Sequence, residues 1–139
     1  MSRSRGRSQQ CSPRDARNRH SHAIKFLEVA EIAAGEHEQD PEYASVAVSL
    51  AVLAGIAAAD AACCKSLGER SRSQDHHDAE RFLRRIAAGG EDAAKHLHAL
   101  LSLKDEAHYG FFDVGAGELR KALRRARALL TFAEDVLRR

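Results

Sequence analysis

Apolar residues recur at helical spacing in several separate stretches of the chain. The first stretch follows Ser12 and Pro13, which are typical of a helix N-cap and of the first helical position. Its polar end is the segment 35–40. The apolar stripe between these limits consists of Ala23, Ile24, Leu27, Ala30, Ile32 and Ala34. Because this spacing follows the helical period, it predicts an amphipathic helix that begins at Pro13.

A second, much more apolar helix is predicted between Pro41 and Gly68. Asp40 supplies the N-cap and Gly68 a C-terminal stop. The helix is nearly apolar on all sides from Tyr43 to Ala59, which is typical either of a membrane span or of a helix enclosed by its neighbours. The run is short for a bilayer and rich in weakly hydrophobic alanine. We therefore expect it to be buried within a helical protein.

A third helix is expected after the polar loop that follows Gly68. Ser73 or Asp75 can cap it, and the pattern places it over about 76–88, where Gly89 and Gly90 end it. This short helix follows directly on the most arginine- and histidine-rich part of the chain.

Two more helices complete the pattern. One begins at Glu91 and stops at Gly110, and the last covers about 118–138. The inward positions expected in the last helix are Leu119, Ala122, Leu123, Ala126, Leu129, Leu130, Ala133 and Leu137. The sequence thus predicts an all-α fold, an antiparallel bundle of four to five helices, in a single domain over 13–139.

Composition supports this prediction and separates the N-terminus from it. Ala, Leu, Arg and Glu dominate a chain of 139 residues that has two prolines and 5% aromatic residues, which favours helices over strands. Residues 1–12 are rich in Ser and Arg and show no apolar period, so we expect a flexible basic arm.

The cysteines and the N-terminus bear on the compartment. Cys11, Cys63 and Cys64 are an odd number, and the last two are neighbours in a predicted helix, so the sequence predicts no disulfide framework and treats both as small core residues. The basic N-terminus is not followed by an apolar stretch, unlike a secretory signal. We expect a cytoplasmic protein.

Charge is distributed unevenly, although the net charge is only +2. Residues 1–20 carry +5 and residues 118–139 carry +4, so the middle of the chain carries −7. Basic ends can attract a polyanion or promote self-association. The basic face of the last helix can contact phosphates without sequence choice, or it can be an ordinary solvated face. Its residues are Arg120, Lys121, Arg124, Arg125 and Arg127.

Three segments together resemble the HEPN superfamily. The small-residue-rich helix "ASVAVSLAVLAGIAAADAACC" ends close to an acid, Asp60. The loop and helix start "RSRSQDHHDAERFL" follows it, and "LKDEAHYGFFDVGAGELRKALRRARALLTFAEDVL" leads into the last helix. The resemblance covers about residues 24–137. It implies an α-helical bundle that dimerises and either cleaves RNA without a metal, as toxin, defence or stress proteins do, or binds RNA or a nucleotidyltransferase partner without catalysis.

The resemblance also implies a catalytic pair, an Arg and a His separated by four to six residues. Arg72 and His77 have four residues between them, and Arg70 and His76 have five. Histidine suits the base and acid of RNA cleavage, and Arg stabilises the phosphorane charge. In the alternative interpretation, this segment is a charged helix start whose acids favour the N-terminal dipole.

The position where the family commonly carries the pair differs here. Lys104 replaces Arg, and three residues separate it from His108, which Tyr109 follows. This arrangement resembles a degenerate copy of the motif, so the chemistry either moved to residues 70–77 or was lost. We expect His108 and Tyr109 to line the same cleft, and a homodimer that acts on RNA, with an antitoxin or nucleotidyltransferase as a candidate partner.

Asp60 and the remaining histidines raise two further questions. An acid at the end of a buried helix needs a partner, which Arg70, Arg72 or His76 can supply, unless Asp60 is exposed at the last turn. The two histidines of each pair, His76–His77 and His96–His98, point to different faces of a helix. Asp105 and His108 can share a face, but no second carboxylate–histidine pair of the same spacing appears in the sequence. The sequence therefore predicts no metal and no cofactor.

Overall fold

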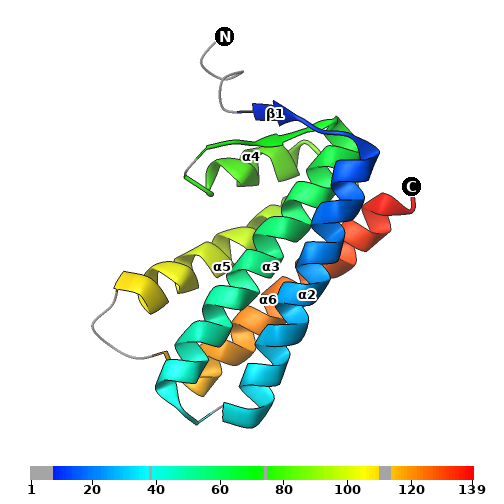
Figure 1. Ribbon diagram of the computed structural model, residues 1–139. Coiled ribbons are helices and arrows are strands. Elements are labelled where there is room, and N and C mark those ends of the chain that lie inside the picture. Colours follow the sequence, from blue (N-terminus) through cyan, green and yellow to red (C-terminus); the bar gives the residue numbers. More distant parts are fainter. Residues whose placement is uncertain (1–7, 38, 74, 110–113) are drawn as a thin grey trace.

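The computed structural model describes residues 8–37, 39–73, 75–109 and 114–139, without the side chains of residues 37 and 106–109. These residues form five helices and two short strands: β1 (Ser8–Gln10), α2 (Pro13–His37), α3 (Pro41–Leu67), β2 (Glu69–Ser71), α4 (Asp78–Arg84), α5 (Gly90–Tyr109) and α6 (Ala116–Leu137). The four long helices pack together, and the strands and α4 lie at one end of them (Figure 1). The predicted helical bundle is confirmed, but the two strands are an addition to the predicted all-α fold.

The first two helices begin at the predicted caps. Ser12 and Asp15 cap α2 reciprocally: the Asp15 amide donates to the Ser12 hydroxyl at 3.1 Å, and the Ser12 amide donates to the Asp15 carboxylate at 2.8 Å. Asp40 accepts a hydrogen bond from the Glu42 amide at 3.0 Å and so caps α3. Gly68, in the left-handed conformation, ends α3. These boundaries depend on local chemistry, which explains why they could be predicted.

Helix α4 is shorter than predicted, ending at Arg84 instead of about residue 88. The chain turns through Ala88 and Gly89, which both have positive φ angles. A Cβ at Gly90 would collide with the carbonyl oxygen of Leu83, so the first turn of α5 packs directly on the end of α4. This close packing ends α4 early.

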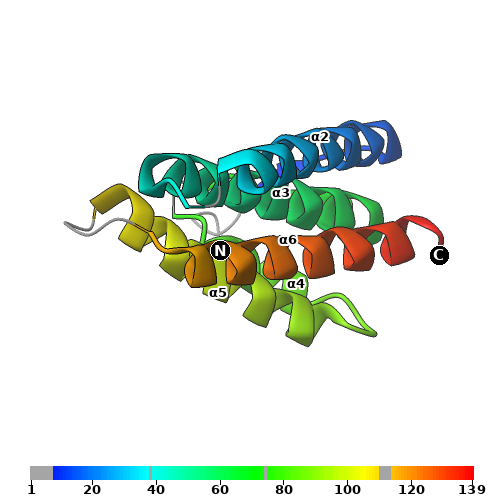
Figure 2. The ribbon, with the colours of Figure 1, turned by 90° about the horizontal axis from the view of Figure 1, so that it is seen from below.

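Helix α3 is the centre of the core. Figure 2 shows it between α2 on one side and α5 and α6 on the other. By length and composition α3 could cross a membrane, but 72% of its most apolar window is buried inside the protein, as expected of an enclosed helix. A Cβ at Gly55 would lie 2.5 Å from Leu100 and 3.2 Å from Leu129, so this glycine lets α5 and α6 approach closely.

The predicted stripe on α2 is only partly correct. Ala23, Leu27 and Ala30 are fully buried against the core. Ile32, which was assigned to the same stripe, is 60% exposed, and Val29 is also exposed. Helix α2 therefore presents apolar side chains to solvent as well as to the core.

The N-terminal segment is fastened to the bundle over its described part. β1 pairs antiparallel with β2, with Gln9 opposite Arg70. A disulfide joins Cys11 to Cys64 on α3, while Cys63 remains a buried free thiol. The expectation that no disulfide forms was wrong, because the strand pairing brings Cys11 to the end of α3. Residues 8–12, assigned to a flexible arm, are tied down here, and residues 1–7 lie outside the described residues.

Candidate functional site

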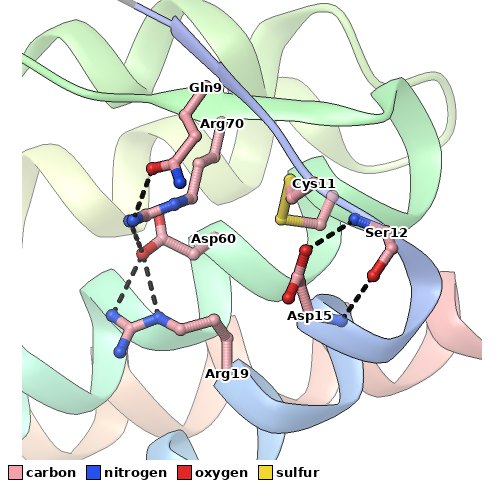
Figure 3. Close-up of a disulfide and its surroundings, with 8 residues drawn as sticks. Gln9, Cys11, Ser12, Asp15, Arg19, Asp60 and Arg70 are labelled. Carbon is pink, nitrogen blue, oxygen red and sulfur yellow. Dashed lines mark hydrogen bonds and ion pairs between the residues drawn. A yellow bond between two sulfur atoms is a disulfide. The ribbon is translucent and has the colours of Figure 1, made fainter.

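A buried carboxylate organises the region where the sheet meets the helices. Asp60, near the end of α3, has its side chain 7% exposed. Its Oδ2 accepts hydrogen bonds from Arg19 Nε at 3.1 Å and from Arg70 Nη1 at 3.0 Å. Arg70 in turn donates to the side-chain oxygen of Gln9 at 3.0 Å. Figure 3 shows Asp60 between the two guanidinium groups, close to the disulfide.

The environment of Asp60 has opposing effects on its charge. Burial raises the pKa of the Asp60 carboxyl, and the charges of Arg19 and Arg70 act in the opposite direction. Of the partners foreseen for Asp60, the structure confirms Arg70. Arg19 was missed, because it lies 41 residues away in sequence and only the packing of α2 on α3 brings it there.

A pocket of about 360 Å³ opens over this carboxylate. Leu53 and Ile56 of α3 form part of its apolar wall. Its polar lining comes from four elements and the loop after β2: Gln9, Arg19, Asp60, Arg70, Ser71, Arg72, Ser73 and His76. Three guanidinium groups and one carboxylate leave this lining with an excess of two positive charges. Such a pocket favours an anion.

Arg72 and His76 are the ionisable side chains of this pocket that are not hydrogen-bonded to Asp60. Arg72 is exposed, and within the part of the chain that the structure describes it makes no hydrogen bond or ion pair. His76 is partly buried, and its pKa is lowered by that burial and by the charge of Lys104. Both side chains are therefore available to a molecule in the pocket.

The structure divides the predicted Arg–His pairs. Arg70 and His76 line the same pocket, whereas His77 lines a neighbouring pocket of about 130 Å³ together with Lys104. Arg72 and His77 are thus not brought to one pocket. His76 lines both pockets. The candidate residues His108 and Tyr109 have side chains outside the described residues.

A second cluster, on the α4–α5 side, was not foreseen. The side chains of His77, Glu80 and His98 offer one ligand atom each, and these atoms lie within 4.8 Å of one another. The histidine pairs in the sequence did not predict this cluster, because Glu80 joins one histidine from each pair. The local signal was the three-residue spacing of His77 and Glu80, which puts both on one helix face.

The basic residues of α6 are only partly available. Arg125 contacts His96 at 3.1 Å, and Arg127 forms an ion pair with Glu31 at 2.7 Å. Arg120, Lys121 and Arg124 are exposed. They lie in the first half of α6, which Figure 1 places toward the end of the bundle opposite the sheet. The predicted nucleic-acid face is therefore separate from the pocket.

Comparison of the chain with protein-family models, with curated proteins and with solved structures gives no match.

Proposed function

We propose that this protein is an HEPN-like RNA-binding domain and that the pocket over Asp60 holds a phosphodiester of the RNA. The observation that carries the proposal is the convergence of Arg19, Arg70 and Arg72 on one pocket. Guanidinium groups bind phosphate oxygens in a bidentate manner, and a buried carboxylate that fixes two of them prepares the site before the ligand arrives.

The roles of the three arginines differ. Asp60 accepts hydrogen bonds from Arg19 and Arg70, so part of their charge is already compensated. Arg72 makes no such contact among the described residues and is the guanidinium best placed to bind the phosphate. Affinity that comes from such contacts falls as the salt concentration rises.

The same pocket supports metal-independent cleavage of RNA. The 2′-oxygen attacks the adjacent phosphorus while a base removes its proton, and the bond from phosphorus to the 5′-oxygen breaks as an acid protonates that oxygen. The products are a 2′,3′-cyclic phosphate and a 5′-hydroxyl. His76 is the imidazole in the pocket for proton transfer, and Arg72 would stabilise the charge on phosphorus.

A dimer would complete this chemistry, because the pocket of one chain contributes a single imidazole. Exposed apolar side chains on α2 and α3 support self-association, and Leu53 belongs both to this exposed set and to the pocket lining. Two copies that meet next to the pocket would place a second His76 close to the bound RNA.

Binding without cleavage is the second candidate function. The observation that favours it is the engagement of Arg70 by Asp60 and Gln9, which leaves Arg72 as the guanidinium beside His76 that has no acidic partner among the described residues. In that case the domain would bind RNA, or a nucleotidyltransferase or antitoxin partner, without cutting the nucleic acid.

RNA binding and cleavage can be measured separately with one set of variants. Anisotropy of a labelled single-stranded RNA reports binding, and gel analysis of mixed RNA in EDTA reports cleavage. Arg72→Ala combined with His76→Ala should weaken binding at least about tenfold, in line with the loss of a charge-assisted contact. Arg81→Ala is the matched control, since Arg81 is an exposed arginine of α4 paired with Asp78.

Each outcome decides between the alternatives. If the wild-type protein binds and cleaves RNA and the double variant does neither, the protein is an RNase. If the wild-type protein binds RNA without cleaving it, the non-catalytic function is supported. The proposal fails if the wild-type protein binds no RNA, or if the double variant binds RNA as tightly as the Arg81→Ala control.

A further inference from the structure

We infer that His77, Glu80 and His98 form a binding site for a divalent transition-metal ion of the Zn²⁺ type. This site is separate from the basic pocket and takes no part in the proposed RNA chemistry. It joins two elements, because His77 and Glu80 lie at the start of α4 and His98 lies on α5.

Glu80 is the centre of the cluster and is unusual in its burial. The residue is 6% exposed, and a buried carboxylate needs compensation from nearby donors or cations. One of its oxygens, Oε2, contacts the Nδ1 atoms of both His77 and His98, the latter at 3.2 Å. Arg84 approaches the other oxygen, Oε1, at 3.8 Å. Among the described residues, the arginine paired with Glu80 thus approaches the oxygen that the imidazoles do not contact.

One of the distances between the three ligand atoms already suits a small ion, and a small outward movement of His77 would adjust the others. Zinc binds imidazole nitrogen and carboxylate oxygen at about 2.0–2.2 Å, so two ligands of a tetrahedral ion lie about 3.3 Å apart. The distance from His98 Nδ1 to Glu80 Oε2 is already 3.2 Å. His77 lies closer to Glu80, but its side chain is 40% exposed and can move outward.

The donor set selects the class of ion. Two imidazoles and one carboxylate, without thiolate, suit Zn²⁺, Co²⁺, Ni²⁺ or Cu²⁺, whereas Mg²⁺ and Ca²⁺ prefer oxygen ligands. The His98 side chain is 62% exposed, so water can occupy the remaining coordination positions. A bound ion would link α4 to α5 and fix the chain next to His76, a residue of the basic pocket.

The test uses the full chain, freed of metal with EDTA and then titrated with Zn²⁺ by calorimetry. We expect one ion per chain and a higher Tm in the presence of Zn²⁺, because the ion binds the folded state. His98→Ala should weaken Zn²⁺ binding by more than about tenfold. This variant should still fold, since the His98 side chain is largely exposed.

His96→Ala is the matched control, because His96 lies on the same helix but contacts Arg125 instead of Glu80. It should bind Zn²⁺ as the wild-type protein does. Glu80→Gln should reduce affinity as His98→Ala does, and Co²⁺ bound to the wild-type chain should show a visible absorption band that His98→Ala lacks. The inference is overturned if Zn²⁺ does not bind, or if His96→Ala and His98→Ala lose the same affinity.

Discussion

Asp60 connects α3 to α2 and β2 through charge, and its replacement tests how much that connection contributes. Asp60→Asn keeps the size of the side chain but leaves Arg19 and Arg70 without their carboxylate. Removing one partner of a buried ion pair typically costs 3–5 kcal/mol, but both arginines are partly exposed and can turn to water. We expect a loss of about 1–3 kcal/mol in the free energy of unfolding, measured with denaturant.

The control for Asp60→Asn is Asp135→Asn, which removes an exposed ion pair with Arg139. This control should change the unfolding free energy by less than about 0.5 kcal/mol. Equal stability of Asp60→Asn and the wild-type protein would mean that burial of the carboxylate cancels the benefit of its two arginines.

Cys63 is a second residue whose environment makes a measurable prediction. Burial, aided by the charge of Asp60, raises the pKa of the Cys63 thiol to about 12. Because the thiolate is the reactive form, the native protein should not react with a thiol reagent at neutral pH. The denatured, unreduced chain should show one thiol, that of Cys63, and the reduced chain three. More than one thiol before reduction would contradict the disulfide.

At the scale of residues, the sequence predicted which side chains need an interaction partner better than it predicted which residues those partners are. Asp60 was recognised as an acid that needs a partner, and Arg70 was among the partners considered. The contact of Arg19 with Asp60 depends on how α2 packs on α3. The cluster in which Glu80 contacts both His77 and His98 depends on how α4 packs on α5. Of these contacts only the one between His77 and Glu80 has a local signal, and the contacts of Arg19 and His98 join residues far apart in sequence.

At the scale of elements, the disulfide holds the edge of the candidate site in place. β1 has only three residues, and it contributes Gln9 to the pocket. The amide of Cys11 also donates to the carbonyl of Gly68 at 2.9 Å. Cysteine pairing thus fastens a segment that could not fold alone. The finding also removes the argument for a reducing compartment that rested on the cysteines.

Cys11→Ser should therefore loosen β1 and destabilise the fold. A cross-link between residues 53 positions apart contributes about 2–4 kcal/mol, largely by restricting the unfolded chain. Amide hydrogen exchange should accelerate in β1 and β2 more than in the middle of α3. Ser12→Ala is the control: it weakens the cap of α2 by about 1 kcal/mol but leaves the disulfide intact. Unchanged exchange in β1 would show that strand pairing alone holds this segment.

Helix boundaries followed from sequence where the signal was local. Asp40, Pro41 and Gly68 act within their own turns, so α3 was predicted to the residue. The strands escaped prediction because each is only three residues long and gains its stability from the other. The early end of α4 was missed because it depends on contact with α5.

At the scale of the whole molecule, the prediction of a helical bundle succeeded because few other folds can bury so apolar a helix as α3. The distribution of charge along the sequence predicted the position of the candidate site less well. The basic stretch of α6 contributes Arg125 and Arg127 to contacts within the bundle, and the excess positive charge of the pocket comes from distant parts of the chain. The location of a site is therefore a property of the packed molecule.

Association of two chains is the prediction that concerns the molecule as a whole. The exposed large hydrophobic side chains among the described residues all lie on α2 and α3: Val29, Ile32, Tyr43, Val46 and Leu53. Exposed apolar side chains that gather on two helices packed together are typical of an interaction site. We expect light scattering to give twice the chain mass of 15.2 kDa at micromolar concentration.

Ile32→Glu combined with Val46→Glu should yield a monomer, because both side chains are more than half exposed and would place charges in the interface. The double variant should keep the helical fold by circular dichroism, since neither side chain contributes to the core. Lys25→Glu changes the net charge by the same amount at another exposed position of α2, and it should leave the dimer intact. A wild-type mass of 15.2 kDa at all concentrations would exclude the dimer, and the proposed RNA binding would then rest on the pocket of a single chain.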